Sequence, residues 1–284
     1  MAAAESAEQL ARRFEREQRQ VLRAAEDKLA AGLGKARVGS VPYLNAVPLT
    51  RGLEEDIVFV PPSQLATLLR KGDLDAGLVS ITEVFFHDIY DILDGVAIAS
   101  LGEVKSVFLA HLDPLDKIGE IACDTASLTS VNLLRVLLTE RGLSPQFRPL
   151  KAYADSSSER NVLLIGDPAI EFIRSNPKHE IWDLGAAWFE LTGLPFVYAV
   201  WAIRRDRNTR ELRQHLREAK NFGLDTLDNI IRTRPEFDLE FRKDYLGWHI
   251  HYHLGTDEKR GIARFLELLK KHQREPVFQP TFTI

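Results

Sequence analysis

Cysteine is nearly absent from this chain. The 284 residues include only Cys123, which excludes a disulfide within the chain and a metal cluster built from cysteine ligands. Because Cys123 lies in the apolar stretch Ile121-Ala122-Cys123-Asp124, we expect it to fill a small space in a buried strand.

Long apolar runs, basic blocks and an export signal are also absent. No apolar run approaches the roughly 18 residues that a membrane-spanning helix needs, so we expect no membrane partner. The net charge is −4 without a block of basic residues, which argues against nucleic acid as a partner. Residues 1–35 lack the basic start, uninterrupted apolar centre and small-residue cleavage site of a signal peptide, so the sequence predicts a cytoplasmic protein.

Residues 1–35 are instead rich in charge and carry a narrow apolar stripe at helical spacing, made of Leu10, Phe14, Val21, Leu22, Ala25 and Leu29. Gly32 and Gly34 end this pattern. It predicts an N-terminal helical extension that packs on the body of the protein or on a second subunit, which leaves a homodimer open. A disordered leader with a helix-like pattern is the alternative, because the charge density is high.

From Val38 onward, expected strands and helices alternate. The chain is long enough for two lobes, and the alternation predicts parallel sheets with right-handed crossovers. The expected strands cover 58–60, 75–80, 96–99, 104–110, 121–124, 147–150, 162–165 and 196–203, and the expected helices cover 63–71, 81–88, 131–141 and most of the chain after 209. Ser63 is the expected cap of its helix.

Polar turns follow several of these strands at their carboxyl ends, namely Ser40 to Asn45, Ser80, Ser127 to Ser130, and Asp167. Ligands bind at this edge of open α/β sheets. Hydroxyls, an amide and helix N-termini suit a small anionic organic molecule. Ordinary turn and capping chemistry explains the same residue types and is the alternative.

Five blocks in this order resemble the chorismate dehydratase family of the futalosine route to menaquinone. The blocks are Val38-Gly39-Ser40-Val41-Pro42-Tyr43-Leu44-Asn45-Ala46-Val47-Pro48-Leu49, Asp75-Ala76-Gly77-Leu78-Val79-Ser80, Ser127-Leu128-Thr129-Ser130-Val131, Leu164-Ile165-Gly166-Asp167-Pro168-Ala169, and Asp183-Leu184-Gly185 with Trp188 and the run from Thr192 to Trp201. The resemblance implies an α/β, two-lobe type II periplasmic-binding-protein-like fold with a ligand cleft between the lobes. We divide the chain into the extension 1–35, a first lobe of 36–103 and 204–284, and a second lobe of 104–203.

The implied reaction removes water from chorismate, a small dicarboxylate, to give 3-[(1-carboxyvinyl)oxy]benzoate, and we expect no cofactor and no metal. Asn45 and Ser106 are the candidate catalytic residues. Ser106, at the crossover between lobes, either donates to the departing hydroxyl or satisfies the backbone of the hinge. The candidate substrate-binding residues are Ser40, Pro42, Tyr43, Ser80, Ser127, Thr129 and Asp167. Neutral donors among these residues are expected to hold the two carboxylates and to stabilise a dienolate-like intermediate.

The group that removes the ring proton is open at this stage. Glu83 is expected on the surface of its helix, and Asp167 is expected to cap a helix. The enolpyruvyl carboxylate of the substrate is the favoured base, because it is tethered near the proton and the motifs are poor in bases. One residue departs from the family pattern: Leu128 stands where the block usually has arginine. We favour a surface position for that arginine, so that its loss changes little.

Two other functions remain. An enzyme like 1,4-dihydroxy-6-naphthoate synthase would need a strong base in the turns of the second lobe, and a non-catalytic cytoplasmic carboxylate-binding protein would share the fold. The tract from Trp248 to His253 resembles a metal site, because His249 and His253 are expected on one helix face. With no third ligand in sight, we interpret these histidines as packing residues.

Overall fold

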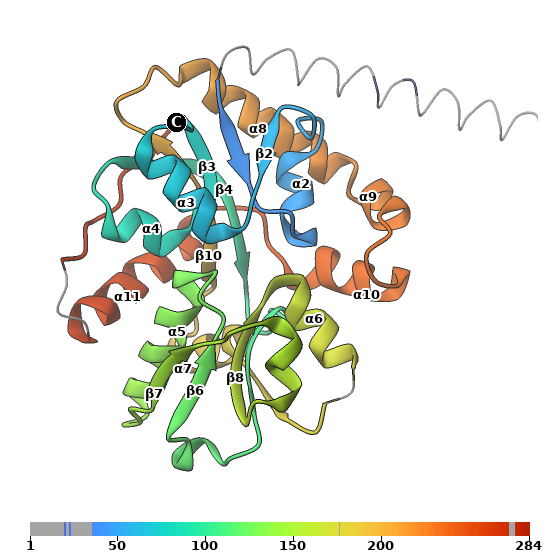
Figure 1. The fold of residues 1–284 in the computed structure, drawn as a ribbon. Helices are drawn as coiled ribbons and strands as arrows, with labels where there is room; N and C mark the ends of the chain where they lie inside the picture. Colours follow the sequence, from blue (N-terminus) through green and yellow to red (C-terminus); the bar gives the residue numbers. More distant parts are fainter. Residues whose placement is uncertain (1–19, 21–22, 24–35, 176, 273–275) are drawn as a thin grey trace, which may run out of the picture.

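The computed structural model describes residues 36–175, 177–272 and 276–284, together with Gln20 and Arg23. Apart from those two residues, the predicted extension 1–35 lies outside the described chain. The described residues form two stacked α/β lobes, each built on one sheet (Figure 1). This arrangement confirms the predicted two-lobe α/β class.

The first lobe contains a six-stranded sheet in the order β11-β4-β10-β3-β1-β2. Its strands are β1 (Val38–Ser40), β2 (Ile57–Phe59), β3 (Ala76–Ser80), β4 (Tyr90–Ser100), β10 (Phe196–Arg204) and β11 (Phe282–Thr283). Strand β10 lies between β3 and β4 and runs antiparallel to both. Its pairing therefore places β10 in the first lobe, although the sequence division assigned residues up to 203 to the second.

The second lobe contains a five-stranded sheet in the order β7-β6-β8-β5-β9. Its strands are β5 (Val107–His111), β6 (Glu120–Cys123), β7 (Gln146–Pro149), β8 (Asn161–Ile165) and β9 (Glu180–Asp183). The expected parallel pairing holds for β1 with β2 and β3, and for β6 with β7 and β8. Strands β5 and β10 run antiparallel to their neighbours. The chain enters β5 and β10 as it passes from one lobe to the other. Neither strand is therefore linked to its sheet neighbour by the helical crossover connection that parallel pairing requires.

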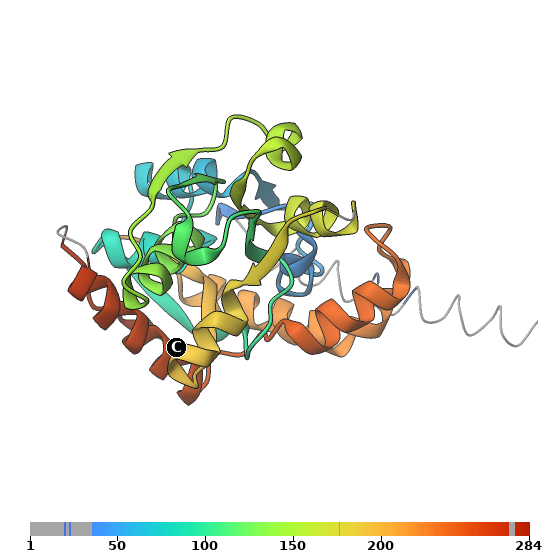
Figure 2. The same cartoon turned by 90° about the horizontal axis from the view of Figure 1, so that it is seen from below.

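The helices cover the faces of the two sheets. Those of the first lobe are α2 (Val47–Thr50), α3 (Pro62–Lys71), α4 (Ile81–Phe86), α8 (Arg210–Asp225), α9 (Leu227–Thr233), α10 (Leu239–Asp244) and α11 (Thr256–His272). Those of the second are α5 (Leu128–Glu140), α6 (Gly166–Arg174) and α7 (Leu184–Thr192). Along the chain, short 3-10 helices form η1 (Leu44–Ala46), η2 (Leu115–Lys117) and η3 (Tyr153–Ser158), and a π-helix forms η4 (Tyr245–His249). Both views show α11 and α9 on opposite sides of the molecule (Figures 1 and 2).

Two local expectations about these elements are settled by the structure. Cys123 is buried in β6, as predicted. The expected cap of α3 at Ser63 is wrong, because the N-cap is Pro61 and the helix begins at Pro62. Proline fits this first position, since its missing N–H would have had no partner within the helix.

The apolar core continues from one lobe to the other. Trp188 of α7 packs edge-on against Phe196 of β10 and Phe265 of α11, and all three are buried. No helix in the part of the chain that the structure describes has the length and apolar character needed to cross a bilayer.

Close packing of α8 on α2 generates a stability prediction. A Cβ atom at Gly223 would lie 1.8 Å from the carbonyl oxygen of Pro48. We therefore expect Gly223→Ala to lower the free energy of unfolding by about 1–3 kcal/mol, because backbone must shift to admit the methyl group. Chemical denaturation measures this change. Gly119→Ala is the control, since nothing lies within 4 Å of its Cβ position, and an equal loss in both variants would contradict the packing argument.

Candidate active site

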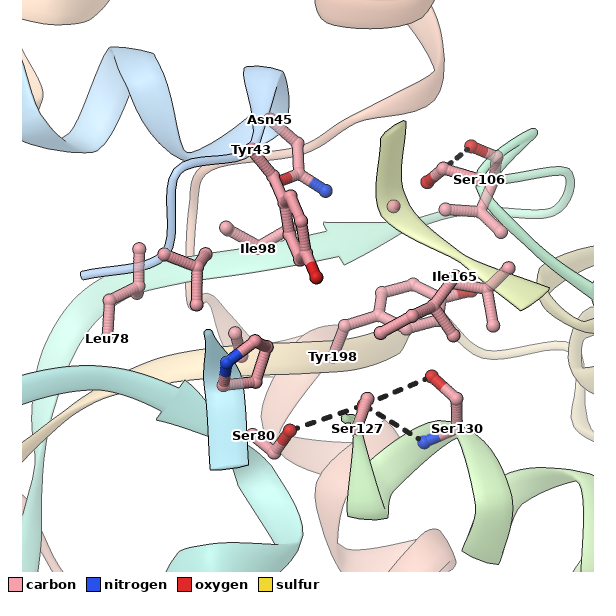
Figure 3. A pocket seen from close by; sticks show the side chains of 16 residues that line it. Tyr43, Asn45, Leu78, Ser80, Ile98, Ser106, Ser127, Ser130, Ile165 and Tyr198 are labelled. Carbon is pink, nitrogen blue, oxygen red and sulfur yellow. Dashed lines mark hydrogen bonds between the residues drawn. The ribbon is translucent and has the colours of Figure 1, made fainter. Parts of the chain in front are cut away.

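A pocket that opens to solvent lies between the lobes, with about 590 Å³ of space free of protein atoms when its open mouth is included. Its walls combine apolar residues with hydroxyl and amide groups (Figure 3). The lining residues are Val41, Tyr43, Asn45, Pro62, Leu78, Ser80, Ile98, Val104, Ser106, Val107, Ser127, Ser130, Ile165, Gly166, Tyr198 and Ala199. None of these side chains is a carboxylate, histidine, lysine or arginine.

The pocket brings together five of the nine predicted site residues. Tyr43 and Asn45 enter from the first lobe, Ser80 lies at the end of β3, Ser106 on the crossover, and Ser127 at the start of α5 (Figure 3). These five come from segments far apart in the sequence. The predicted meeting of polar turns therefore occurs in the structure for these residues.

The other four predicted residues do not line this pocket. Ser40 is fully buried in β1 and Pro42 is exposed. Thr129 is fully buried, and its hydroxyl accepts a hydrogen bond from the backbone N–H of Thr82 at 3.2 Å. Asp167 faces the first lobe outside the lining residues. Thr129 and Asp167 therefore join the lobes rather than line the cavity.

Asn45 and Ser106 are linked through a tyrosine from the C-terminal part of the chain. Asn45 Nδ2 donates to the hydroxyl of Tyr245 at 3.2 Å, and that hydroxyl donates to Ser106 Oγ at 2.8 Å. Tyr245 is fully buried. The two candidate catalytic side chains therefore have fixed positions relative to each other.

The second polar cluster lies at the N-terminus of α5. Ser127 Oγ accepts from the backbone N–H of Ser130 at 3.3 Å and from its hydroxyl at 3.2 Å. Ser80 Oγ lies 3.3 Å from the same atom, across the boundary between lobes (Figure 3). First-turn N–H groups have no partner within a helix, so this end of α5 favours an anion.

The expectation that Asp167 caps a helix is wrong. The N-cap of α6 is Ile165, and Asp167 lies inside the first turn of that helix. Its two carboxylate oxygens each lie 3.3 Å from the backbone N–H of Leu44, which donates to them. Burial raises the pKa of Asp167 to about 6, and the hydrogen bond from Leu44 counteracts part of this rise.

The crossing segment between the lobes is held by Asp183. Its carboxylate accepts hydrogen bonds from the backbone N–H groups of Val104 at 3.1 Å and Lys105 at 2.8 Å, and from Ala186 at the start of α7. Lys105 has a φ of 63°, a left-handed conformation that costs free energy in a residue other than glycine. Asp183 therefore compensates the strain at the point where the chain enters the second lobe.

Glu83 is not on the helix surface as expected. It is buried, and it accepts hydrogen bonds from Arg70 at 2.7 Å and Tyr90 at 3.2 Å. The expected shared helix face of His249 and His253 is also wrong, because His249 ends η4 and His253 lies beyond it in extended chain. The described residues contain no group of three side chains suited to a metal ion.

Two tyrosines that are not among the predicted site residues, Tyr245 and Tyr198, also belong to the site. Tyr198 lines the pocket, with its hydroxyl 3.2 Å from Ser100 Oγ. Tyr245 lies 139 positions from Ser106, so no local pattern connects the two. Leu128 is 41% exposed and does not line the pocket.

Comparison with known proteins identifies the family. A family model described as menaquinone biosynthesis matches residues 36–271. The chain belongs to this family. It is 33% identical over 256 residues to a chorismate dehydratase from Thermus thermophilus, covering 82% of this chain and 94% of that protein. A chorismate dehydratase from Campylobacter jejuni is 27% identical over 232 residues, covering 80% and 91%.

Solved structures confirm the periplasmic-binding-protein-like fold. A protein from Archaeoglobus fulgidus matches with a TM-score of 0.67 at 19% identity, covering 83% of this chain and 96% of that one. The alkanesulfonate-binding protein SsuA from Xanthomonas axonopodis, bound to MOPS, matches with a TM-score of 0.63 at 15% identity, covering 87% and 97%. Because both structures are less than 20% identical in sequence to this chain, the similarity shows the fold alone.

The raised pKa of Asp167 generates a pH prediction. The carboxyl group of Asp167 binds a proton more tightly in the folded protein than in the unfolded chain. Its ionisation therefore destabilises the folded protein fully above about pH 6 and not at all below about pH 4. We expect Asp167→Asn to raise the free energy of unfolding at pH 7 by about 1–2 kcal/mol, with the gain gone at pH 3.5. Denaturant titrations at several pH values measure it.

Asp113→Asn is the control of opposite sign. Hydrogen bonds from Arg160 and Asn161 lower the pKa of Asp113 to about 2, so this variant is expected to lose stability at pH 7. If Asp167→Asn also loses stability there, the buried carboxylate does not carry the predicted penalty.

Proposed function

We propose that this protein is a cytoplasmic chorismate dehydratase that converts chorismate to 3-[(1-carboxyvinyl)oxy]benzoate and water in menaquinone biosynthesis. The observation that carries the proposal is that Asn45, Ser106 and the Ser127 end of α5 meet in one pocket, in a chain of the menaquinone-biosynthesis family.

The reaction is an elimination that the aromatic product favours. The ring C–H bond beside the enolpyruvyl ether breaks, and its electron pair is delocalised into the ring carboxylate. The delocalised pair then forms a new ring C=C bond as the ring C–O bond to the hydroxyl breaks. The electron pair of that C–O bond leaves with the oxygen, and a proton completes the water. Oxidation and reduction play no part in this balance, so the protein's task is to lower the barrier.

Uncharged donors suit the two carboxylates of the substrate. The N-terminus of α5 with Ser127 and Ser80 forms one anion site, and the Asn45 amide faces the cavity from the other lobe. Donors already in place stabilise the negative charge that develops on the ring carboxylate, typically by a few kcal/mol. Leu128 stands outside the lining, which supports binding of the carboxylate by neutral groups alone.

The base is assigned to the enolpyruvyl carboxylate of the substrate. The pocket-lining residues supply no carboxylate or histidine, Glu83 is buried against Arg70, and Asp167 is engaged with the Leu44 N–H. A tethered carboxylate has a high effective concentration at the proton. The proton that it takes is then available to the departing hydroxyl, to which Ser106 donates a hydrogen bond.

The first test is Asn45→Asp. A further negative charge beside the two substrate carboxylates is expected to reduce turnover by at least about 100-fold, because a donor is replaced by a repelling group. Absorbance of the aromatic product after addition of chorismate measures the rate. Asn221→Asp, on the exposed face of α8, is the matched control. Full activity in Asn45→Asp would contradict the assigned role, and a wild-type protein that binds chorismate without turnover would favour a non-catalytic binder.

The second test concerns the base. An analogue of chorismate that lacks the enolpyruvyl carboxylate is expected to bind but to lose water at least about 100-fold more slowly, because the tethered base is missing. Calorimetry measures binding and absorbance measures conversion. Dehydration at the normal rate would eliminate the substrate carboxylate as the base.

A further inference from the structure

Tyr245 stands directly behind the pocket without lining it. It begins η4, in a part of the chain 200 positions from Asn45 and 139 from Ser106. Its side chain is fully buried, yet its hydroxyl contacts both candidate catalytic side chains. It is therefore placed to act on the reaction through these two residues.

The directions of the hydrogen bonds decide what Tyr245 does. Asn45 uses one N–H on the tyrosine oxygen at 3.2 Å, which leaves its other N–H and its carbonyl oxygen for a ligand. The tyrosine proton points to Ser106 Oγ at 2.8 Å. Among the described residues, the remaining acceptor for the Ser106 proton is the Val104 carbonyl at 3.5 Å, the limit of a hydrogen bond. A ligand in the pocket can therefore receive the Ser106 proton as a hydrogen bond.

The tyrosine remains a donor across the working pH range. Burial raises the pKa of Tyr245 far above its usual value of 10, and the nearby carboxylates of Asp167 and Asp183 raise it further. Its hydroxyl holds one fixed orientation while charge develops elsewhere.

We propose that Tyr245 is the positioning residue of the active site, which orients the Asn45 amide toward the substrate carboxylate and turns the Ser106 hydroxyl toward the departing hydroxyl. The inference rests on the proposed function. It adds a contribution of the C-terminal segment to a site otherwise built from residues 41–199.

Packing alone does not account for this hydroxyl. The ring of Tyr245 stacks on Phe241 with centroids 5.4 Å apart, and a phenylalanine would retain that contact. Nearby Tyr252 is a natural comparison, because its buried hydroxyl has no hydrogen-bond partner among the described residues. Tyr245 and Tyr252 thus separate the loss of a positioning hydroxyl from the loss of any buried hydroxyl.

The experiment compares Tyr245→Phe with Tyr252→Phe in steady-state dehydration of chorismate, followed by absorbance. We expect Tyr245→Phe to lower kcat at least about tenfold with KM within about threefold, because the orientation of donors matters most in the transition state. Tyr252→Phe is expected to stay within about twofold in both constants. A Tyr245→Phe enzyme with normal kcat, a loss confined to KM, or an equal loss of kcat in Tyr252→Phe would overturn the inference.

A double-mutant cycle and a structure test the same claim by other means. In the Ser106→Ala background, Tyr245→Phe is expected to cost less than in the wild type, since part of its effect passes through Ser106. A crystal structure of Tyr245→Phe is expected to show the Asn45 amide or the Ser106 hydroxyl turned from its wild-type orientation. Unchanged orientations of both would refute the positioning role. Because this last result needs no turnover, it also decides the inference if the wild-type protein fails to dehydrate chorismate, an outcome that would overturn only the proposed function.

Discussion

The contacts that fix the crossing segment between the two lobes are the constraint on which the site depends. Pocket groups come from both lobes and from the crossing segment between them, so their mutual distances exist only if the lobes are held in register. The Asp183 carboxylate fixes the crossing segment by accepting hydrogen bonds from the backbone N–H groups of Val104 and Lys105, next to Ser106. The packing is close here as well, since a Cβ at Gly185 would lie 2.4 Å from the Gly102 carbonyl oxygen. A strained crossing segment is thus fixed by one half-buried carboxylate.

The chemistry follows from a pocket whose lining carries no ionisable group other than two tyrosines. A fixed cation would bind a dicarboxylate tightly in the ground state as well as in the transition state, and only the difference between the two accelerates the reaction. In the proposed mechanism, neutral donors in fixed positions favour the state in which charge has moved onto the ring carboxylate. The acidic groups nearby are engaged elsewhere, Glu83 with Arg70 and Asp167 with Leu44.

Sequence patterns predicted the fold well where the evidence is local. The alternation of elements and the polar turns after β1, β3, β6 and β8 all occur in the structure. Predictions failed where partners are distant. Glu83 was expected in solvent because its helical position says nothing of Arg70 and Tyr90. Residues 196–203 were assigned to the second lobe because strand pairing is not visible in a single segment.

The sequence by itself determined the alternating α/β class and which turns carry polar groups, because periodicity and turn chemistry act between near neighbours. The family and its two-lobe fold came from the resemblance of five sequence blocks to known proteins. Only the tertiary structure decided which of those groups share a cavity. Thr129 points from α5 to Thr82, whereas Ser127, two residues earlier, opens into the pocket. Tyr245 reaches Asn45 and Ser106 through the packing of η4 on the crossing segment. The direction of a side chain at the end of a helix depends on what packs against it. That contact comes from 47 positions away for Thr129, and from 139 and 200 positions away for Tyr245.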